Sequence, residues 1–166
     1  MKRLLLILIA VVLLLTALGC TKKTESFSVP ENFYYRRNSV AFHTDDAVIK
    51  PEIRETADCR DKILDTVNLY LQGPVSDKFI SPFPQGLTAL SIEQIDDSLV
   101  LQLNDSFNNL NGLERTIACS CLFRTLTDLT GCNIVEIQFS SADRNGFDSI
   151  ILSNDDLCFA DAGSED

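Results

Sequence analysis

The sequence has few residues that could carry out catalysis, and its only histidine is His43. His43 precedes Thr44, Asp45 and Asp46, and a neighbouring carboxylate could orient it as a general base. No serine or cysteine nucleophile motif accompanies it, so a histidine at the end of a surface strand is the simpler interpretation. We therefore predict no catalytic residue in this chain.

Basic residues are also few, because 14 lysines and arginines stand against 24 acidic residues, for a net charge of −10. Loss of a leader that contains Lys2 and Arg3 lowers the charge to −12. A surface this acidic repels phosphate polymers. Nucleic acid, teichoic acid and anionic lipid headgroups are thus disfavoured as surface-bound partners, unless a local basic patch overrides the total charge.

The apolar run Leu4–Leu15 is shorter than the stretch of about 20 residues that spans a membrane. It lies between a basic start and small residues, which is the pattern of a secretory signal; a retained anchor helix is the alternative. Ala17-Leu18-Gly19-Cys20 resembles the bacterial lipobox. That resemblance implies cleavage between Gly19 and Cys20 and two or three acyl chains, palmitate among them, on Cys20. We predict a lipoprotein held on the outer face of the cell membrane.

Cysteine usage argues against a disulfide framework, because lipidation of one of the six cysteines leaves an odd number. Cys119 and Cys121 lie two apart in a helix pattern and project to different sides, so they should not bond to each other. Structural zinc spacing is missing, and Asp96-Asp97 and Asp155-Asp156 lack an EF-hand pattern. We predict buried thiols, no metal and no other cofactor; the non-lipidated cysteines are Cys59, Cys119, Cys121, Cys132 and Cys158.

Three of the five prolines fall within Tyr70–Gly86, where a helix pattern gives way to a strand pattern. Cys59–Gln72 is the predicted helix, with Asp58 as N-cap. Gly73 permits the positive φ that ends a helix, and Pro74 prevents continuation. Val75–Gly86, called the proline loop below, is predicted to be extended and turning. The helix buries one apolar stripe: Ile63, Val67, Tyr70 and Leu71.

Alternating apolar and polar residues predict a hairpin from Leu87–Ile95 and Leu99–Leu103, with Leu90 and Ile92 facing the core from the first strand. A second amphipathic helix is predicted over Leu113–Thr130 and ends at Gly131. Its predicted stripe is Leu113, Ile117, Cys121, Leu122, Leu126 and Leu129. The other predicted extended segments are Ser39–Thr44, Ala47–Glu55 with a break at Pro51, Cys132–Ser140 and Ser149–Leu152.

This order of elements predicts an α+β fold, a single two-layer sandwich in which a mainly antiparallel sheet carries two helices on one face. Residues 1–19 are the predicted signal peptide, 20–38 a lipid-anchored tether, 39–160 the domain and 161–166 an acidic tail. Phe33, Tyr34 and Tyr35 could pack on the domain edge or lie at the membrane surface, and packing is the simpler role.

Four motifs stand together: Leu71-Gln72-Gly73-Pro74, Pro82-Phe83-Pro84-Gln85-Gly86, Leu99–Asp105 followed by Ser106-Phe107, and Thr125-Leu126-Thr127-Asp128-Leu129 before Val135-Glu136-Ile137. They resemble the GerMN domain of bacterial sporulation and germination lipoproteins, over roughly Ser39–Phe159. The resemblance implies an extracytoplasmic module for sporulation, germination or peptidoglycan-associated assembly, without an established catalytic centre. Many members carry two copies, whereas this chain has room for one.

We therefore expect a binding or assembly module rather than an enzyme. Its expected partners are the membrane, through lipid on Cys20, and an envelope protein or cell-wall glycan; a homo-oligomer is a further alternative. Phe79, Ile80 and Phe83 are the candidate binding residues, although covering the end of the core is the simpler role. The expected open sheet face is mainly polar: Ser91, Glu93, Val100, Gln102, Glu136 and Gln138.

Two other functions remain as alternatives. An enzyme acting on peptidoglycan needs two carboxyl groups about 5 to 10 Å apart. The proline loop offers only Asp77, and Glu93 lies on the strand beyond it. A sensor of small germinants would need an apolar pocket that a small two-layer sheet has little volume to supply.

Overall fold

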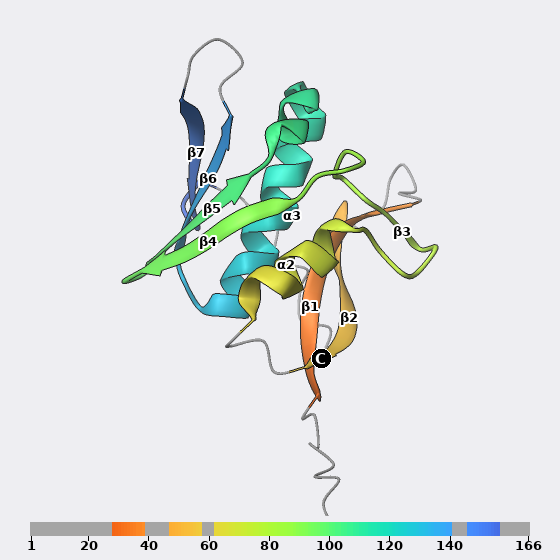
Figure 1. Cartoon of the computed structure of the whole chain (residues 1–166). Helices are drawn as coiled ribbons and strands as arrows, with labels where there is room; N and C mark the ends of the chain where they lie inside the picture. The colour runs from red at the N-terminus through yellow and green to blue at the C-terminus, as the bar shows by residue number, and fades with distance from the viewer. Residues whose placement is uncertain (1–27, 39–46, 58–61, 141–145, 157–166) are drawn as a thin grey trace, which may run out of the picture.

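The computed structural model describes residues 28–38, 47–57, 62–140 and 146–156. Within these ranges the strands form two sheets, one of order β2-β1-β3, in which β3 is the short strand Phe79–Ile80, and one of order β4-β5-β6-β7 (Figure 1). All neighbouring strands are antiparallel except β5 and β6, which are parallel. The α+β class and the mainly antiparallel pairing are confirmed, but the described strands are divided between two sheets instead of forming one.

The four-stranded sheet contains the predicted hairpin, β4 (Ala89–Ile95) and β5 (Ser98–Leu103). It continues with β6 (Ile134–Ser140) and β7 (Phe147–Ser153). One face is buried against the helices, because α2 (Ile63–Leu71) packs on β4 and α3 (Gly112–Thr130) packs on β6. The buried face is lined by Leu99, Leu101, Leu103, Val135, Ile137 and Phe139.

Leu90 does not face the core as predicted, because it is 52% exposed. A β-bulge lies between Ala89, which pairs with Leu103, and Ser91, which pairs with Gln102. The extra residue reverses the in-out alternation of the strand. Ala89 and Ile92 are therefore the inward residues on either side of the bulge, and Leu90 points to solvent.

The three-stranded sheet corrects the predicted tether. Ser28–Arg37 is β1, which pairs along its length with β2, Ile49–Ala57. Pro51 does not break β2; it lies opposite Tyr34 on an edge strand, where a residue without an N–H is tolerated. The predicted strand Ser39–Thr44, and His43 with it, lies outside the described residues.

β1 also lies against α3. The Tyr34 amide donates to Thr125 Oγ1 at 2.9 Å, and the Tyr34 hydroxyl donates to Asp128 at 2.9 Å. The Arg124 guanidinium lies 5.3 Å from the centre of the Tyr34 ring. These contacts fix the direction in which β1 crosses the domain.

The first predicted helix is confirmed as α2 (Ile63–Leu71), with Val67, Tyr70 and Leu71 buried. Its predicted N-cap, Asp58, lies outside the described residues. The second is confirmed as α3 (Gly112–Thr130), which ends at Gly131 with φ of 74°. The single buried stripe predicted for α3 is wrong at its start, since Leu113 is 74% exposed.

The centre of α3 is buried on nearly all sides. Ala118, Cys119, Ser120, Cys121, Leu122 and Phe123 are consecutive and all buried. The physical reason is that α3 packs against β1 of one sheet and β6 of the other. A helix between two layers has no wide solvent face, which one amphipathic stripe does not describe.

The segment between β5 and α3 holds a short 3-10 helix, η1 (Asp105–Asn109). Phe107 and Leu110 are buried here and anchor the connector, as predicted from the sequence. Among the described residues, no helix is long and apolar enough to cross a bilayer.

Candidate functional site

The proline loop starts where α2 ends. Gly73 has φ of 103°, and its amide donates to the Tyr70 carbonyl at 3.0 Å. Six residues further on, Phe79–Ile80 forms the short strand β3, which pairs with Arg36 and Arg37 of β1. The loop is therefore held by backbone hydrogen bonds near its start and again at β3.

Glu52 of β2 binds the beginning of the loop. Its carboxylate accepts hydrogen bonds from the amides of Ser76 at 2.7 Å and Val75 at 3.1 Å. Arg54, on the same face of β2, donates to Glu52 at 2.6 Å and to the Gly73 carbonyl at 2.7 Å. Glu52 is only 8% exposed, so these partners are what compensate for removing its charge from water.

This ion pair could not be recognised in the sequence. Glu52 and Arg54 bond to residues that lie 19 to 24 positions away along the chain. The only local signal was their spacing of two residues, which puts both side chains on one face of a strand.

The ionisable groups of this network have structural roles. Burial alone would raise the pKa of Glu52, but the Ser76 amide, the Arg54 guanidinium and the Val75 amide hold that pKa below its usual value of 4.5. Burial raises the pKa of the Tyr35 and Tyr70 phenols, so both remain protonated. Neither phenol is suited to accept a proton in catalysis.

Aromatic side chains connect the loop to β1 and α2. The Tyr70 ring centre lies 5.0 Å from those of Tyr35 and Phe83 and 5.5 Å from that of Phe33. Phe33, Tyr35 and Tyr70 are fully buried, and Phe83 is 8% exposed. Phe83 thus belongs to the core, while Phe79 and Ile80 are half-buried beside it. Phe33 and Tyr35 pack within the domain, which confirms the simpler of the two roles predicted for them.

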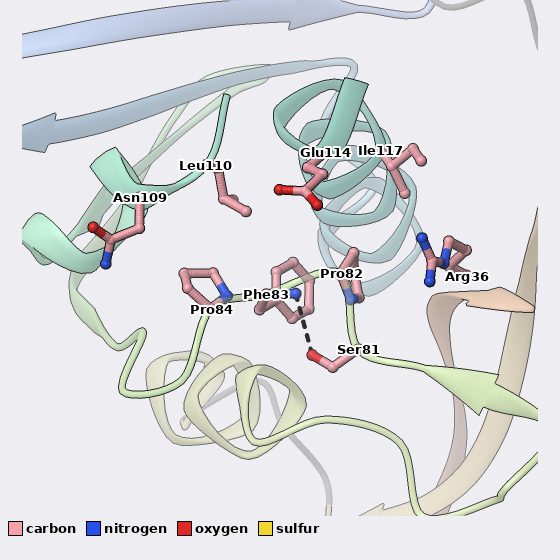
Figure 2. A pocket seen from close by; sticks show the side chains of 9 residues that line it. All are labelled: Arg36, Ser81, Pro82, Phe83, Pro84, Asn109, Leu110, Glu114 and Ile117. Atoms are coloured by element: carbon pink, nitrogen blue, oxygen red, sulfur yellow. Dashed lines mark hydrogen bonds between the residues drawn. The ribbon is translucent and has the colours of Figure 1, made fainter. Parts of the chain in front are cut away.

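The outer side of Phe83 forms the floor of a groove between the proline loop and the start of α3 (Figure 2). Its volume is about 280 Å³. Arg36 and Glu114 place opposite charges at its margin, and the Phe83 amide is held by Ser81 Oγ at 3.2 Å. The other lining residues are Pro82, Pro84, Asn109, Leu110 and Ile117.

The groove therefore brings together only part of the predicted binding set. Phe83 lines it, whereas Phe79 lies on the other side, at β3, and lines a second cavity. No sequence pattern indicated that Arg36, Asn109 and Glu114 meet at the loop. Arg36 belongs to β1, whereas Asn109 and Glu114 belong to the η1–α3 segment, and both segments are distant from the loop along the chain. Gly19 and Cys20 lie outside the described residues.

The carboxylates considered for an enzyme are not gathered in this groove. Asp77 and Glu93 are exposed, and Glu114 is the only acidic residue among the described ones that line the groove. Asp97 binds the Asn133 side chain at 3.0 Å, and Asp156 accepts from the Ser153 hydroxyl at 2.7 Å. The described residues contain no group of three or more side chains that could hold a metal ion.

The described thiols are also structural. Cys119, Cys121 and Cys132 are free and buried. Burial raises the pKa of Cys119 to about 11 and that of Cys121 to about 12, so both are thiols at neutral pH. Cys59 and Cys158 lie outside the described residues.

The open face of the four-stranded sheet carries the predicted polar residues, and Ser91 donates to Gln102 at 3.2 Å there. The open face is more apolar than predicted, however. The same face also presents Ile95, Ile134, Phe147 and Ile151, all exposed.

The chain is similar to known proteins in its structure and not detectably in its sequence. No family model matches the chain, and no curated protein matches it by sequence. The structure is similar to "Tandem GerMN domains of the sporulation protein GerM from Bacillus subtilis", with a TM-score of 0.54 and 18% identity over 74% of this chain. The described domain therefore has a GerMN-like fold. It spans 42% of the tandem protein, so the likeness is to part of that molecule.

A second solved structure is similar over most of its length. It is described as "Putative Lipoprotein from Clostridium perfringens", with a TM-score of 0.46 and 15% identity. The match covers 78% of this chain and 89% of that one. At 18% identity the likeness to the tandem GerMN structure is a likeness of fold.

Proposed function

We propose that this protein is a lipid-anchored, extracytoplasmic binding module that holds an envelope protein during sporulation, germination or cell-envelope assembly. Three observations support the proposal: the secretory and lipobox pattern that ends at Cys20, the GerMN-like fold, and the groove beside Phe83. The groove is the main support, because it is the feature of the described surface that can select a partner.

The chemistry of the groove fits a polypeptide segment. Phe83, Leu110 and Ile117 offer apolar surface, and Arg36 and Glu114 add one positive and one negative group. A segment with apolar side chains between an acidic and a basic residue would satisfy both charges. A groove of about 280 Å³ is large enough for a few side chains, which suits a short anchor sequence in a larger partner.

Binding is a better use of this groove than glycoside hydrolysis. That reaction needs a general acid and a second carboxylate on the other side of the scissile bond. Glu114 would supply one carboxylate. The other charged group among the described residues that line the groove is the Arg36 guanidinium, which cannot replace the second carboxylate. The lipid anchor would also confine the domain to a thin layer at the membrane, which raises its effective concentration for partners in that layer.

The anchor is tested by Cys20→Ala in cells that produce the full-length protein. Without a thiol to acylate, the variant should be released from the membrane fraction or remain as an unprocessed precursor. Cell fractionation with the intact mass of each species distinguishes these results from the wild type. A cleaved, shortened variant that stays in the membrane fraction would contradict lipidation at Cys20.

A further inference from the structure

The open face of the four-stranded sheet carries apolar side chains that neither described helix covers, because α2 and α3 both pack on the other face (Figure 1). Ile95, Phe147 and Ile151 are 55 to 63% exposed, and Ile134 is 37% exposed. Val100 of β5 lies among them and is half-buried. These five residues are called the sheet patch below. Exposed apolar residues gathered on one face are typical of a binding surface.

The strand register sets two carboxylates within the sheet patch. Val100 pairs with Glu93 of β4 on one side and with Glu136 of β6 on the other. Glu136 in turn pairs with Ile151 of β7. Directly paired residues point to the same face of a sheet, so one row across the open face reads carboxylate, valine, carboxylate, isoleucine. Apolar surface and negative charge are therefore interleaved.

No basic residue offsets this charge in the described part of the sheet. Residues 89–103, 133–140 and 146–156 include the four strands and the turns at one end of them, and they contain no lysine, arginine or histidine. Glu136 accepts a hydrogen bond from the neutral Gln138 side chain at 3.0 Å, which does not cancel its charge. The acidic residues of these ranges are Glu93, Asp96, Asp97, Glu136, Asp148, Asp155 and Asp156.

The charges decide which occupant suits the sheet patch. Two copies of the chain stacked through their open faces would bring Glu93 and Glu136 against the same residues of the second copy, and like charges across an interface cost free energy. An anionic lipid surface would be repelled for the same reason. A segment with apolar side chains and with lysines or arginines would instead cover the apolar residues and neutralise the carboxylates.

We propose that the open face binds a basic amphipathic helix of a partner protein. The four strands are separated by three spacings of about 4.8 Å, so the face is roughly 14 Å wide and accommodates one helix about 10 to 12 Å in diameter. β6 has 7 residues and is about 23 Å long, which matches about 15 residues of helix. The apolar stripe of the helix lies on the sheet patch, and its basic residues lie beside Glu93 and Glu136.

This surface is separate from the groove beside Phe83. The groove is lined by Glu114 and Ile117 of α3, which packs on the buried face of the sheet, and it shares no residue with the sheet patch. A partner on the open face therefore leaves the groove accessible. The proposal goes beyond binding at the groove and does not depend on it.

The test is a fluorescence anisotropy titration with a labelled peptide of about 15 residues, in which leucine recurs at helical spacing and lysine fills the other positions. The protein is the chain of residues 20–166 with Cys20→Ala, so that no lipid or detergent competes for the peptide. Glu93→Lys/Glu136→Lys should weaken binding at least about tenfold, because attraction becomes repulsion. Ile151→Ser should weaken binding about fivefold, because it removes an apolar contact.

Matched controls make the same changes elsewhere. Asp65→Lys/Asp77→Lys reverses two exposed acidic residues of α2 and the proline loop, and Ile53→Ser alters an isoleucine of β2 that is 69% exposed. Both controls should bind the peptide within about twofold of the wild type. A peptide with glutamate in place of lysine should bind at least about tenfold more weakly.

Four results would overturn the proposal. They are no binding of the leucine–lysine peptide, equal weakening by the open-face variants and their controls, equal binding of the glutamate peptide, and a dimer of the wild type that Ile151→Ser dissociates. The last result, from sedimentation velocity, would assign the open face to a second copy of the chain. None of them alters the outcomes expected at the groove or for Cys20→Ala.

Discussion

Arg54 donates a hydrogen bond of 2.7 Å to the carbonyl oxygen of Gly73. This contact joins β2 to the glycine that lies between the end of α2 and the start of the proline loop. Arg54 also lies over Phe33, 5.2 Å from its ring centre, so the polar network and the aromatic core share one side chain. The loop that forms the groove is thus positioned by a strand far from it in the sequence.

Glu52→Gln should destabilise the fold by about 3 kcal/mol, because it removes one partner of a buried ion pair and puts an amide group among hydrogen-bond donors. The free energy of unfolding from urea denaturation measures the effect. Glu93→Gln is the matched control, since Glu93 is exposed, and it should change stability by less than about 0.5 kcal/mol. Equal effects of the two substitutions on the free energy of unfolding would show that Glu52 does not have this structural role.

The contribution of Glu52 should depend on pH. Its pKa is lowered in the folded protein, so its stabilisation is present above the unfolded pKa and is lost as pH falls through the folded value. The stability difference between wild type and Glu52→Gln should therefore be constant near neutral pH and shrink below about pH 4.5. A difference that grew on acidification would mean that the folded pKa is raised instead.

Phe83→Ala should lower the free energy of unfolding by about 3 kcal/mol or more, because it removes a ring packed on Tyr70 and Tyr35. Thermal unfolding followed by circular dichroism should show a melting temperature lower by roughly 10 °C. Phe147→Ala makes the same change at a ring that is 55% exposed and should have little effect. A melting temperature unchanged by Phe83→Ala would place its ring outside the core.

Local signals in the sequence were sufficient for the elements that have them. The helical spacing of Val67, Tyr70 and Leu71 and the glycines after each helix predicted α2 and α3 within a few residues. The alternation around Leu101 predicted the hairpin. These patterns depend only on residues that are close in the sequence, within one or two helical turns or a few strand positions.

What the sequence did not predict depends on distant contacts. β1 was missed because the run Phe33-Tyr34-Tyr35 has no polar alternation: Phe33 and Tyr35 are buried while Tyr34 reaches Asp128 of α3. Leu90 was misplaced because a single extra residue reverses the strand. Arg36 and Glu114 of the groove lie 78 positions apart, and only the fold brings them to one surface.

The claim that the groove binds a protein is tested most directly by photocrosslinking in intact cells. A photoreactive residue in place of Asn109, an exposed residue at the groove, should give one protein adduct. Charge reversal by Arg36→Glu or Glu114→Arg in the same chain should reduce that adduct several-fold, and the same photoreactive residue at Leu90 should not form it. An adduct that forms equally from Leu90, or that neither charge reversal reduces, would contradict binding through the groove.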